Sequence, residues 1–331
     1  MTRRLLLAAC LIAVAAAPAA AYLKLGFRVG GRVTTVRWID RPVPYFVTNR
    51  DGGGLTAPQI EAAIGRAFDS WAGEPTIDLS FAFRGYTGAE PFDEDGMNTI
   101  GFVNEPELER VLGATGFTVD TVTGRILESD IFFNAAFDWS VAPGGDPNGF
   151  DLESTALHEI GHFIGLGHSA IGETELFAGD RRRVIAKEAV MFPIAFPMGS
   201  ISDRVLKADD IAGGSDIYPA GDFARTHGSV SGRVLLDGRG IFGAHVTAFS
   251  LETGRIVGGF TLDDDGRFVI SGLVPGLHVV RVEPLDDGDI GSYFDSDADV
   301  EVDFQAAIAP ALVSVPAGGA AGDITIAVRA R

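Results

Sequence analysis

The segment 158–168, with the sequence HEIGHFIGLGH, carries the residue types and spacing of a metal-dependent hydrolytic site. Two histidines four residues apart lie on one face of a helix, one turn apart, where a single Zn²⁺ can bind both imidazoles. Glu159 follows the first histidine, and beside such a metal its carboxylate can act as a base toward water. The spacing therefore predicts a zinc helix that holds His158, His162 and Glu159 in one site.

Gly165 and His168 extend this pattern beyond the helix. Because glycine has no Cβ, Gly165 can adopt a left-handed conformation that ends the helix and turns the chain sharply. The turn brings His168 back as a third metal ligand. Three protein nitrogens leave one tetrahedral position for water, which is typical of a catalytic zinc rather than a structural one. Three of the chain's six histidines lie in this short window, which disfavours a chance arrangement.

The extended motif H-E-x-x-H-x-x-G-x-x-H resembles that of the metzincin zinc peptidases. Metzincins place a methionine turn beneath the zinc ligands, and Met191 in AVMFP fits that turn. Within the clan the chain is most similar to the matrixins, because Ser169 follows the third histidine and the turn lacks the tyrosine of astacins and serralysins. The resemblance implies a secreted zinc metalloendopeptidase in which Met191 forms the floor beneath the ligands.

Residues 206–218 resemble the closing helix of matrixins, with two departures. Lys207 stands where a capping serine is usual, and Gly213 and Gly214 are expected to weaken the helix interior. Matrixins also carry a structural zinc on additional histidines. No histidine precedes His158, so we expect one catalytic Zn²⁺. Structural Ca²⁺ on backbone and Asp oxygens stays an open alternative that the sequence does not locate.

Residues 1–21 have the three parts of a secretory signal peptide. Arg3 and Arg4 precede an apolar stretch, and three alanines at 19–21 form a small-residue cleavage site. A retained anchor and a lipoprotein box at Cys10 are the alternatives; the apolar run continues past Cys10, which favours a chance cysteine. Because Cys10 is the only cysteine, the mature chain is expected to be free of disulfides. We expect a secreted, periplasmic or cell-surface protein.

Two domains are expected, 22–222 and 228–331, joined by a linker at 223–227. The first is interpreted as an α+β metzincin catalytic domain with a twisted mixed sheet, the zinc helix and an irregular lower subdomain. A helix over 60–71 should begin with a capping box of Thr56 and Gln59, and Pro44 suggests an edge strand. Strands are expected at 33–37, 43–47, 79–83, 98–103, 114–119 and 126–133.

Residues 228–331 alternate apolar side chains between Gly-containing turns, which predicts an all-β Ig-like or transthyretin-like sandwich. The phrases GAHV, DGRF and GLVPG resemble the carboxypeptidase regulatory-like domain, a likeness that implies fold and no chemistry. His245 and His278 are expected to face strand neighbours. Residues 295–299 resemble the start of a calcium loop, but Val300 stands where glycine is needed, which favours a solvated acidic loop. The sandwich is expected to supply nothing to the zinc site, so that a chain ending near Asp222 would still cleave short peptides.

Charge and hydropathy exclude two classes of partner. The formal net charge is −19, and no basic patch interleaved with aromatic residues is present, which argues against nucleic acid. The uncharged segment 305–322 contains Pro310 and Pro316, which argues against a membrane span. We therefore expect a protein or peptide substrate.

In the mechanism that the resemblance implies, Glu159 takes a proton from the attacking water and passes it to the leaving amine. The substrate is expected to pair with an edge strand at 113–117, beside a specificity pocket walled by 192–197. Two rival functions stay open. One is a secreted β-sandwich binding or adhesion protein with an inert zinc domain, against which the retained Glu159 argues. The other is a zinc amidase acting on a non-protein amide such as peptidoglycan.

Overall fold

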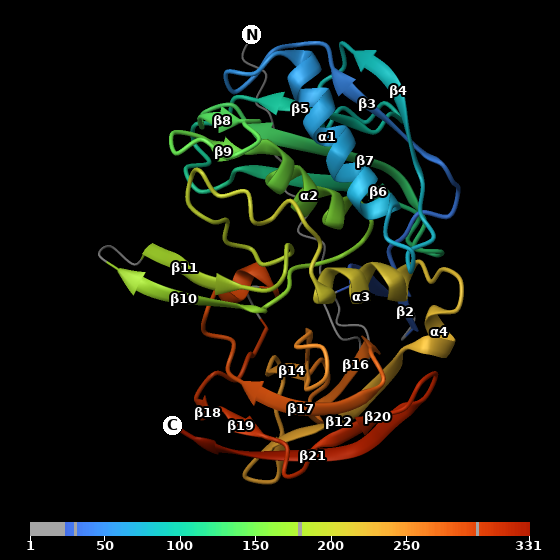
Figure 1. Cartoon of the computed structure of the whole chain (residues 1–331), viewed down its shortest axis with the longest axis vertical. Coiled ribbons are helices and arrows are strands. Elements are labelled where there is room, and N and C mark those ends of the chain that lie inside the picture. Colours follow the sequence, from blue (N-terminus) through green and yellow to red (C-terminus); the bar gives the residue numbers. More distant parts are fainter. Residues whose placement is uncertain (1–23, 30–31, 178–180, 296–297) are drawn as a thin grey trace.

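The computed structural model describes residues 24–29, 32–177, 181–295 and 298–331. An upper lobe contains a mixed sheet with two helices, and a lower lobe, residues 228–331, is built of strands (Figure 1). The expected signal peptide with Cys10, and residues 296–297 of the acidic loop, lie outside the described residues. In the described part of the chain, no helix has the length and apolar character needed to span a membrane.

A five-stranded sheet in the order β4-β3-β5-β7-β6 frames the upper lobe. Its neighbours pair in parallel except at β6, which pairs antiparallel with β7 and forms an edge. The strands overlap the ranges predicted from sequence: β3 (Val43–Thr48), β4 (Phe81–Thr87), β5 (Thr99–Val103), β6 (Gly113–Val119) and β7 (Ile126–Asn134).

The position of β3 corrects one expectation, because β3 lies inside the sheet and not at its edge. Its pairing with β5 begins only at Phe46, whereas Pro44 is registered with Ala82 of β4. Pro44 therefore has a strand neighbour on one side alone, which is how the internal strand accommodates a residue without a backbone N–H.

Helices α1 (Ala57–Ala72) and α2 (Leu152–Phe163) pack together on one face of this sheet. The backbone N–H of Thr56 donates to Gln59 Oε1 at 3.0 Å, as the capping-box pattern predicted. The indole N–H of Trp71, on the buried face of α1, donates to the carbonyl of Leu157 at 3.0 Å. This bond and the apolar face of α1 hold α2 in place.

Both ends of α2 have a local cause in the sequence. At the start, Asp151 is the N-cap, and its Oδ2 accepts a hydrogen bond from the backbone N–H of Ser154 at 2.9 Å. At the other end Gly165 has φ +100°, and a Cβ there would lie 2.4 Å from the carbonyl oxygen of Val36. Only glycine fits this turn, which directs the chain toward His168.

The segment after His168 is not irregular throughout, which corrects a second expectation. β10 (Gly172–Phe177) and β11 (Arg181–Lys187) form an antiparallel hairpin that extends from the side of the molecule (Figure 1). Opposite charges face each other across its two strands, with Arg183 Nε 2.6 Å from Glu175 Oε1. Such cross-strand pairs favour the hairpin although Leu176 and Ile185 on it are exposed.

Helix α3 (Ala208–Ile217) forms in spite of the unusual residues noted in its sequence. Asp210 Oδ2 accepts from the backbone N–H of Lys207 at 2.9 Å, so a carboxylate in the first turn replaces the missing capping serine. A Cβ on Gly214 would lie 2.5 Å from Ile77 Cδ1. Glycine thus permits a close approach of α3 to its neighbour, and packing outweighs the lower helix propensity.

The lower lobe is a sandwich of two five-stranded sheets. One has the order β13-β12-β21-β18 with β16 also on β12, and the other β15-β14-β17-β19 with β20 also on β17. Their bounds are β12 (Gly228–Leu236), β13 (Arg239–Gly240), β14 (His245–Ser250), β15 (Ile256–Phe260), β16 (Arg267–Leu273), β17 (Gly276–Glu283), β18 (Phe304–Gln305), β19 (Ala307–Ile308), β20 (Val313–Val315) and β21 (Ala320–Ala330).

Short elements complete the chain. They are β1 (Gly26–Val29), β2 (Arg32–Thr35), β8 (Trp139–Ser140), β9 (Phe150–Asp151), α4 (Phe223–Thr226) and the 3₁₀ turn η1 (Ile290–Ser292). The expected linker therefore contains a helical turn, α4, whose Phe223 is buried.

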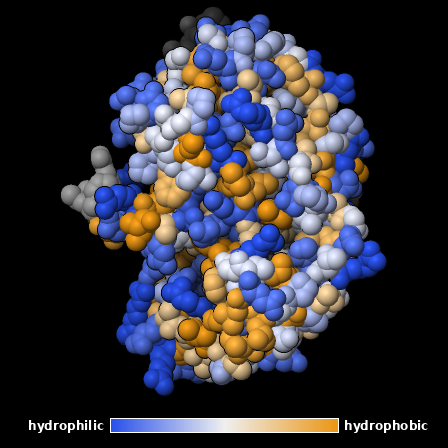
Figure 2. Space-filling view, viewed as in Figure 1, coloured by the Kyte–Doolittle hydropathy of each residue, from blue (hydrophilic) through white to orange (hydrophobic). Residues whose placement is uncertain are grey.

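The two lobes share buried apolar clusters. One cluster of buried apolar side chains extends through both, and a second joins Ala170 to five residues of the lower lobe: Phe260, Leu262, Leu285, Tyr293 and Phe294. On the outer surface seen in Figure 2, hydrophobic residues gather over the lower lobe and hydrophilic residues follow its left margin. Ala170 lies two residues after His168, so the shared core reaches the zinc motif.

Candidate metal centre

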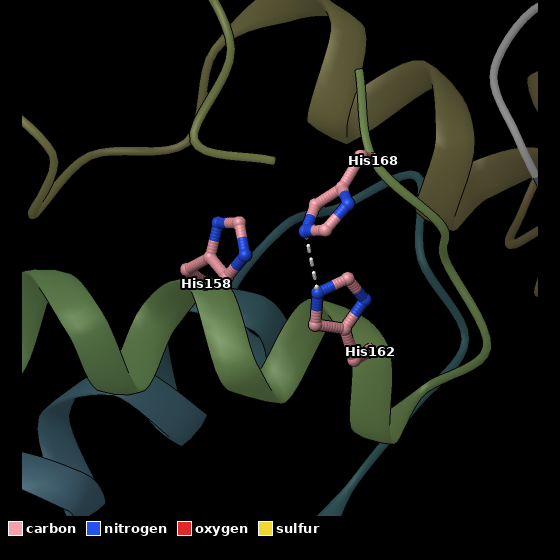
Figure 3. Close-up of side chains that lie close together, drawn as sticks. All are labelled: His158, His162 and His168. Carbon is pink, nitrogen blue, oxygen red and sulfur yellow. Dashed lines mark hydrogen bonds between the residues drawn. The ribbon is translucent and has the colours of Figure 1, made fainter. Parts of the chain in front are cut away.

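Three imidazoles converge where α2 meets the segment that follows it. His158 and His162 project from successive turns of α2, and His168 faces them from the returning chain (Figure 3). Their ligand atoms all lie within 4.8 Å of one another, and Nε2 of His162 is 3.2 Å from Nε2 of His168. Zn–N bonds of about 2.0–2.1 Å place tetrahedral ligand nitrogens about 3.3–3.4 Å apart, so the spacing fits zinc. This is the one three-residue metal-ligand cluster in the part of the chain that the structure describes.

Backbone carbonyls set the tautomer of each ring. Nδ1 of His158 lies 2.8 Å from the carbonyl oxygen of Val190, and Nδ1 of His162 lies 2.9 Å from that of Leu166. Nδ1 of His168 lies 2.6 Å from the carbonyl oxygen of Ser292. Since a carbonyl only accepts, each Nδ1 donates and each neutral ring keeps its Nε2 lone pair. The close Nε2 lone pairs of His162 and His168 are favourable when a cation lies between them.

The electrostatics of the site keep the rings neutral. Burial and the two neighbouring imidazoles hold the pKa of His158 well below its ordinary range. Burial, with the nearby His168, lowers the pKa of His162 to about 3, and burial also lowers the pKa of His168. Neutral imidazole is the form that binds metal, so the triad is prepared for a cation at neutral pH.

Glu159 is buried beside the triad, with 4% of its surface exposed. The hydroxyl of Thr115 on β6 donates to Glu159 Oε2 at 2.8 Å, and burial raises the pKa of this carboxyl to about 7. A Cβ on Gly113 would lie 3.3 Å from Glu159 Oε1. On the edge strand, Thr115 thus orients Oε2 of Glu159 by a hydrogen bond. Gly113, which has no side chain, leaves space beside Oε1.

Met191 lies under α2, where the resemblance to metzincins implied a floor. It is buried, and a Cβ on Gly161 would lie 2.1 Å from its Sδ, so glycine makes room for the sulfur. Asp210 on α3 holds the turn: Oδ2 accepts from the backbone N–H of Val190 at 2.8 Å, and Oδ1 from that of Met191 at 3.1 Å. The carbonyl of the same Val190 orients His158, so α3 positions a candidate metal ligand through this turn.

The triad opens into a cavity of about 1080 Å³. One wall is the edge strand β6 with Gly113 and Thr115, and a second is the segment 192–197. Residues 289 and 291–295 of the lower lobe line it as well. Lys187, also in the lining, forms a buried ion pair with Asp203, with Nζ 2.6 Å from Oδ2.

All four chemical residues singled out in the sequence, Glu159 and the three histidines, meet in this site. Sequence reasoning missed Thr115, Asp210 and the Ser292 carbonyl. Their local sequence carries no signal for the role, because each contact depends on the tertiary fold. His245 and His278 lie apart in the sandwich, where Nδ1 of His245 is 3.2 Å from Glu283 Oε1 on the adjacent strand.

Comparison with known proteins bears on the upper lobe. Residues 37–178 match the family model described as Matrixin. The chain is 30% identical over 199 residues to Metalloendoproteinase 4-MMP of Arabidopsis thaliana, covering 57% of this chain and 48% of that protein. Metalloendoproteinase 5-MMP of the same plant is 48% identical over 157 residues, which cover 40% of this chain and 38% of that protein. The chain thus spans less than half the length of these curated relatives.

Among solved structures, the match to the Bacillus anthracis TIE protein covers 32% of this chain and 17% of that protein's chain. The identity is 13% and the TM-score 0.22. That likeness is too slight to bear on either lobe.

Proposed function

We propose that the protein is a secreted endopeptidase with one catalytic zinc on His158, His162 and His168, a proposal supported by the match of residues 37–178 to the Matrixin model and by the similarity to plant metalloendoproteinases. The observation that carries this proposal is the placement of the buried Glu159 carboxylate beside three imidazoles whose free Nε2 atoms converge. A base and a neutral nitrogen triad in one cleft are the parts needed to hydrolyse an amide.

When bound, a zinc ion supplies Lewis acidity that polarises the scissile carbonyl and acidifies water. Glu159 acts on the protons: its carboxylate takes one from the attacking water and then donates it to the leaving amine. Thr115 holds Oε2 by a hydrogen bond, which orients the other oxygen, Oε1, toward the open side left by Gly113. The near-neutral pKa of this buried carboxyl suits a group that both accepts and releases a proton.

The substrate lies extended along β6. Among the described strands β6 pairs with β7 alone, so its outer edge offers backbone donors and acceptors to a peptide in β-augmentation. Residues 192–197 wall the pocket that receives a substrate side chain. Behind them the Lys187–Asp203 pair places both charges next to the pocket wall.

Two rival functions are weighed against this proposal. A binding or adhesion protein with an inert metal site has no use for Glu159 held by Thr115 at the metal triad. A zinc amidase acting on peptidoglycan would use the same residues and the same chemistry, so the substrate decides between amidase and peptidase.

Incubation of the purified mature chain with casein, gelatin and peptidoglycan tests the proposal. We expect cleavage of the protein substrates that stops with a chelator and returns when Zn²⁺ is added back. Release of peptidoglycan fragments with casein and gelatin intact would favour the amidase. Absence of chelator-sensitive hydrolysis on all three, in a chain that retains zinc, would favour the inert domain.

A further inference from the structure

We infer that the β-sandwich is part of the metal site, because the Ser292 carbonyl orients His168 as a ligand. This inference rests on the proposed zinc site and assigns the lower lobe a role in it. Ser292 is thus a positioning residue that acts through its main chain on the third histidine. The earlier expectation that the sandwich supplies nothing to the site is thereby revised.

The hydrogen bond itself carries the inference. Nδ1 of His168 lies 2.6 Å from the Ser292 carbonyl oxygen, a separation in sequence of 124 residues. The corresponding carbonyls for His158 and His162 belong to Val190 and Leu166, in the same lobe as the histidines. Only the third ring of the triad obtains its orienting partner from the other lobe.

His168 also has the greatest need of such a partner. His158 and His162 project from α2, whose backbone is held by helical hydrogen bonds and by packing on α1. His168 lies on the non-helical segment that follows Gly165. Its ring orientation therefore depends on the Ser292 carbonyl and on Tyr293, whose ring centroid lies 6.3 Å from that of His168.

The Ser292 carbonyl is held in place by η1. The backbone N–H of Ser292 donates to the carbonyl of Asp289 at 2.8 Å, and that of Tyr293 donates to Ile290 at 2.9 Å. Tyr293 is buried, in the same cluster as Ala170. The turn is thus anchored on the segment that carries His168.

Further contacts attach the two lobes to each other. The backbone N–H of Thr174 on the β10–β11 hairpin donates to Asp287 Oδ1 at 2.9 Å. Asp209 Oδ1 on α3 accepts from the backbone N–H of Gly258 at 2.8 Å, and a Cβ on Gly258 would lie 3.0 Å from Ile171 Cγ1. These contacts hold the lobe that carries the Ser292 carbonyl against the lobe that carries His168.

The test compares two proline substitutions in the full mature chain. Ser292→Pro removes the backbone N–H that donates to the carbonyl of Asp289, and it displaces the Ser292 carbonyl. The control is Leu312→Pro, at an exposed residue in the sandwich loop between β19 and β20. Each protein is titrated with Zn²⁺ against a competing chelator, and the visible spectrum of its Co²⁺ form is recorded. Circular dichroism of the metal-free proteins checks folding.

We expect Ser292→Pro to bind Zn²⁺ about 10–100-fold more weakly than wild type, the usual effect of losing a ligand's outer hydrogen-bond partner. Its Co²⁺ spectrum should change, while Leu312→Pro matches wild type in both measurements. A folded Ser292→Pro with unchanged affinity and unchanged spectrum would overturn the inference. Failure of wild type to bind Zn²⁺ would instead refute the proposed function.

Should Ser292→Pro not fold, Asp287→Ala decides the question. This change removes the carboxylate that accepts from the backbone N–H of Thr174, a contact that holds the segment before η1 against the other lobe, so weaker Zn²⁺ binding with an altered Co²⁺ spectrum supports the inference. A zinc affinity and a Co²⁺ spectrum that both equal those of wild type would overturn the inference.

Discussion

The hydroxyl of Thr115 donates to Oε2 of Glu159 across 2.8 Å, and it also lies 3.0 Å from the backbone carbonyl oxygen of Glu159. The hydrogen bond from the edge strand therefore orients the carboxylate of the candidate base, and the short contact with the carbonyl oxygen places Thr115 against α2. Thr115 thus links the strand proposed to bind substrate to the carboxylate proposed to act on that substrate.

Thr115→Val should lower turnover of a peptide substrate about 10–100-fold, because a hydrogen bond to a charged group contributes about 1.5–3 kcal/mol. Zinc content should stay unchanged, since Thr115 contacts no metal ligand side chain. Thr118→Val is the control, as Thr118 lies on the same strand with an exposed side chain. Wild-type turnover in Thr115→Val would show that Glu159 does not depend on this bond.

His162→Ala should lose bound zinc, because two imidazoles remain where tetrahedral coordination needs three and water. Metal analysis is expected to find about one Zn²⁺ per wild-type chain and far less in the variant. His227→Ala is the matched control, since His227 stacks on Phe223 outside the triad. Full zinc occupancy in His162→Ala would remove this residue from the ligand set.

Breaking the Lys187–Asp203 pair should destabilise the fold. Both residues are buried, and Asp203 Oδ1 already has no hydrogen-bond partner among the described residues. Lys187→Met leaves the Asp203 charge uncompensated, and such changes lower the free energy of unfolding by about 3–5 kcal/mol. The double change Lys187→Met with Asp203→Leu should recover most of that loss. Equal stability of the single and double variants in urea unfolding would contradict this explanation.

Asp130 gives a pH-dependent stability outside the metal site. Burial raises the pKa of this carboxyl from 3.8 to about 7, although it accepts backbone hydrogen bonds from Thr99 and Phe92 at 2.7 and 2.6 Å. Between roughly pH 4 and pH 7 the folded state holds a proton that the unfolded state has released. The contribution of Asp130 to stability is therefore largest at low pH and is lost as pH rises through about 7.

Asp130→Asn removes this titration, so the variant provides the reference. The difference in unfolding free energy, wild type minus Asp130→Asn, should be more positive at pH 5 than at pH 8. Urea unfolding of both proteins at the two pH values measures it. A difference that is independent of pH, or greater at pH 8, would refute the raised pKa.

The zinc helix could be predicted from sequence because its determinants are local. Histidines four apart meet on a helix face whatever the rest of the chain does, and Gly165 marks the turn that directs His168 back. The apolar face of α1 follows from spacing in the same way. The positions of the candidate ligands and of the candidate base on α2 therefore needed no tertiary information.

The expectations that the structure corrects depend on contacts between distant segments. Gly214 weakens an isolated helix, but its lack of a Cβ allows α3 to approach Ile77. The Ser292 carbonyl has no side-chain signature, and only the docking of the sandwich shows that it orients His168. Separate lobes were expected because the strand pattern ends and restarts near Gly228, whereas the buried cluster around Ala170 crosses that boundary.

Glu159 is the residue proposed to transfer protons in a zinc-dependent peptidase. The most direct test measures peptide turnover and zinc content of Glu159→Gln beside wild type, since glutamine preserves the shape of the side chain and cannot act as the base. We predict about one Zn²⁺ per chain in both proteins and turnover lower by about 10²–10⁴-fold in the variant, the usual scale for a positioned acid–base group. Near-normal hydrolysis by zinc-loaded Glu159→Gln would contradict the account.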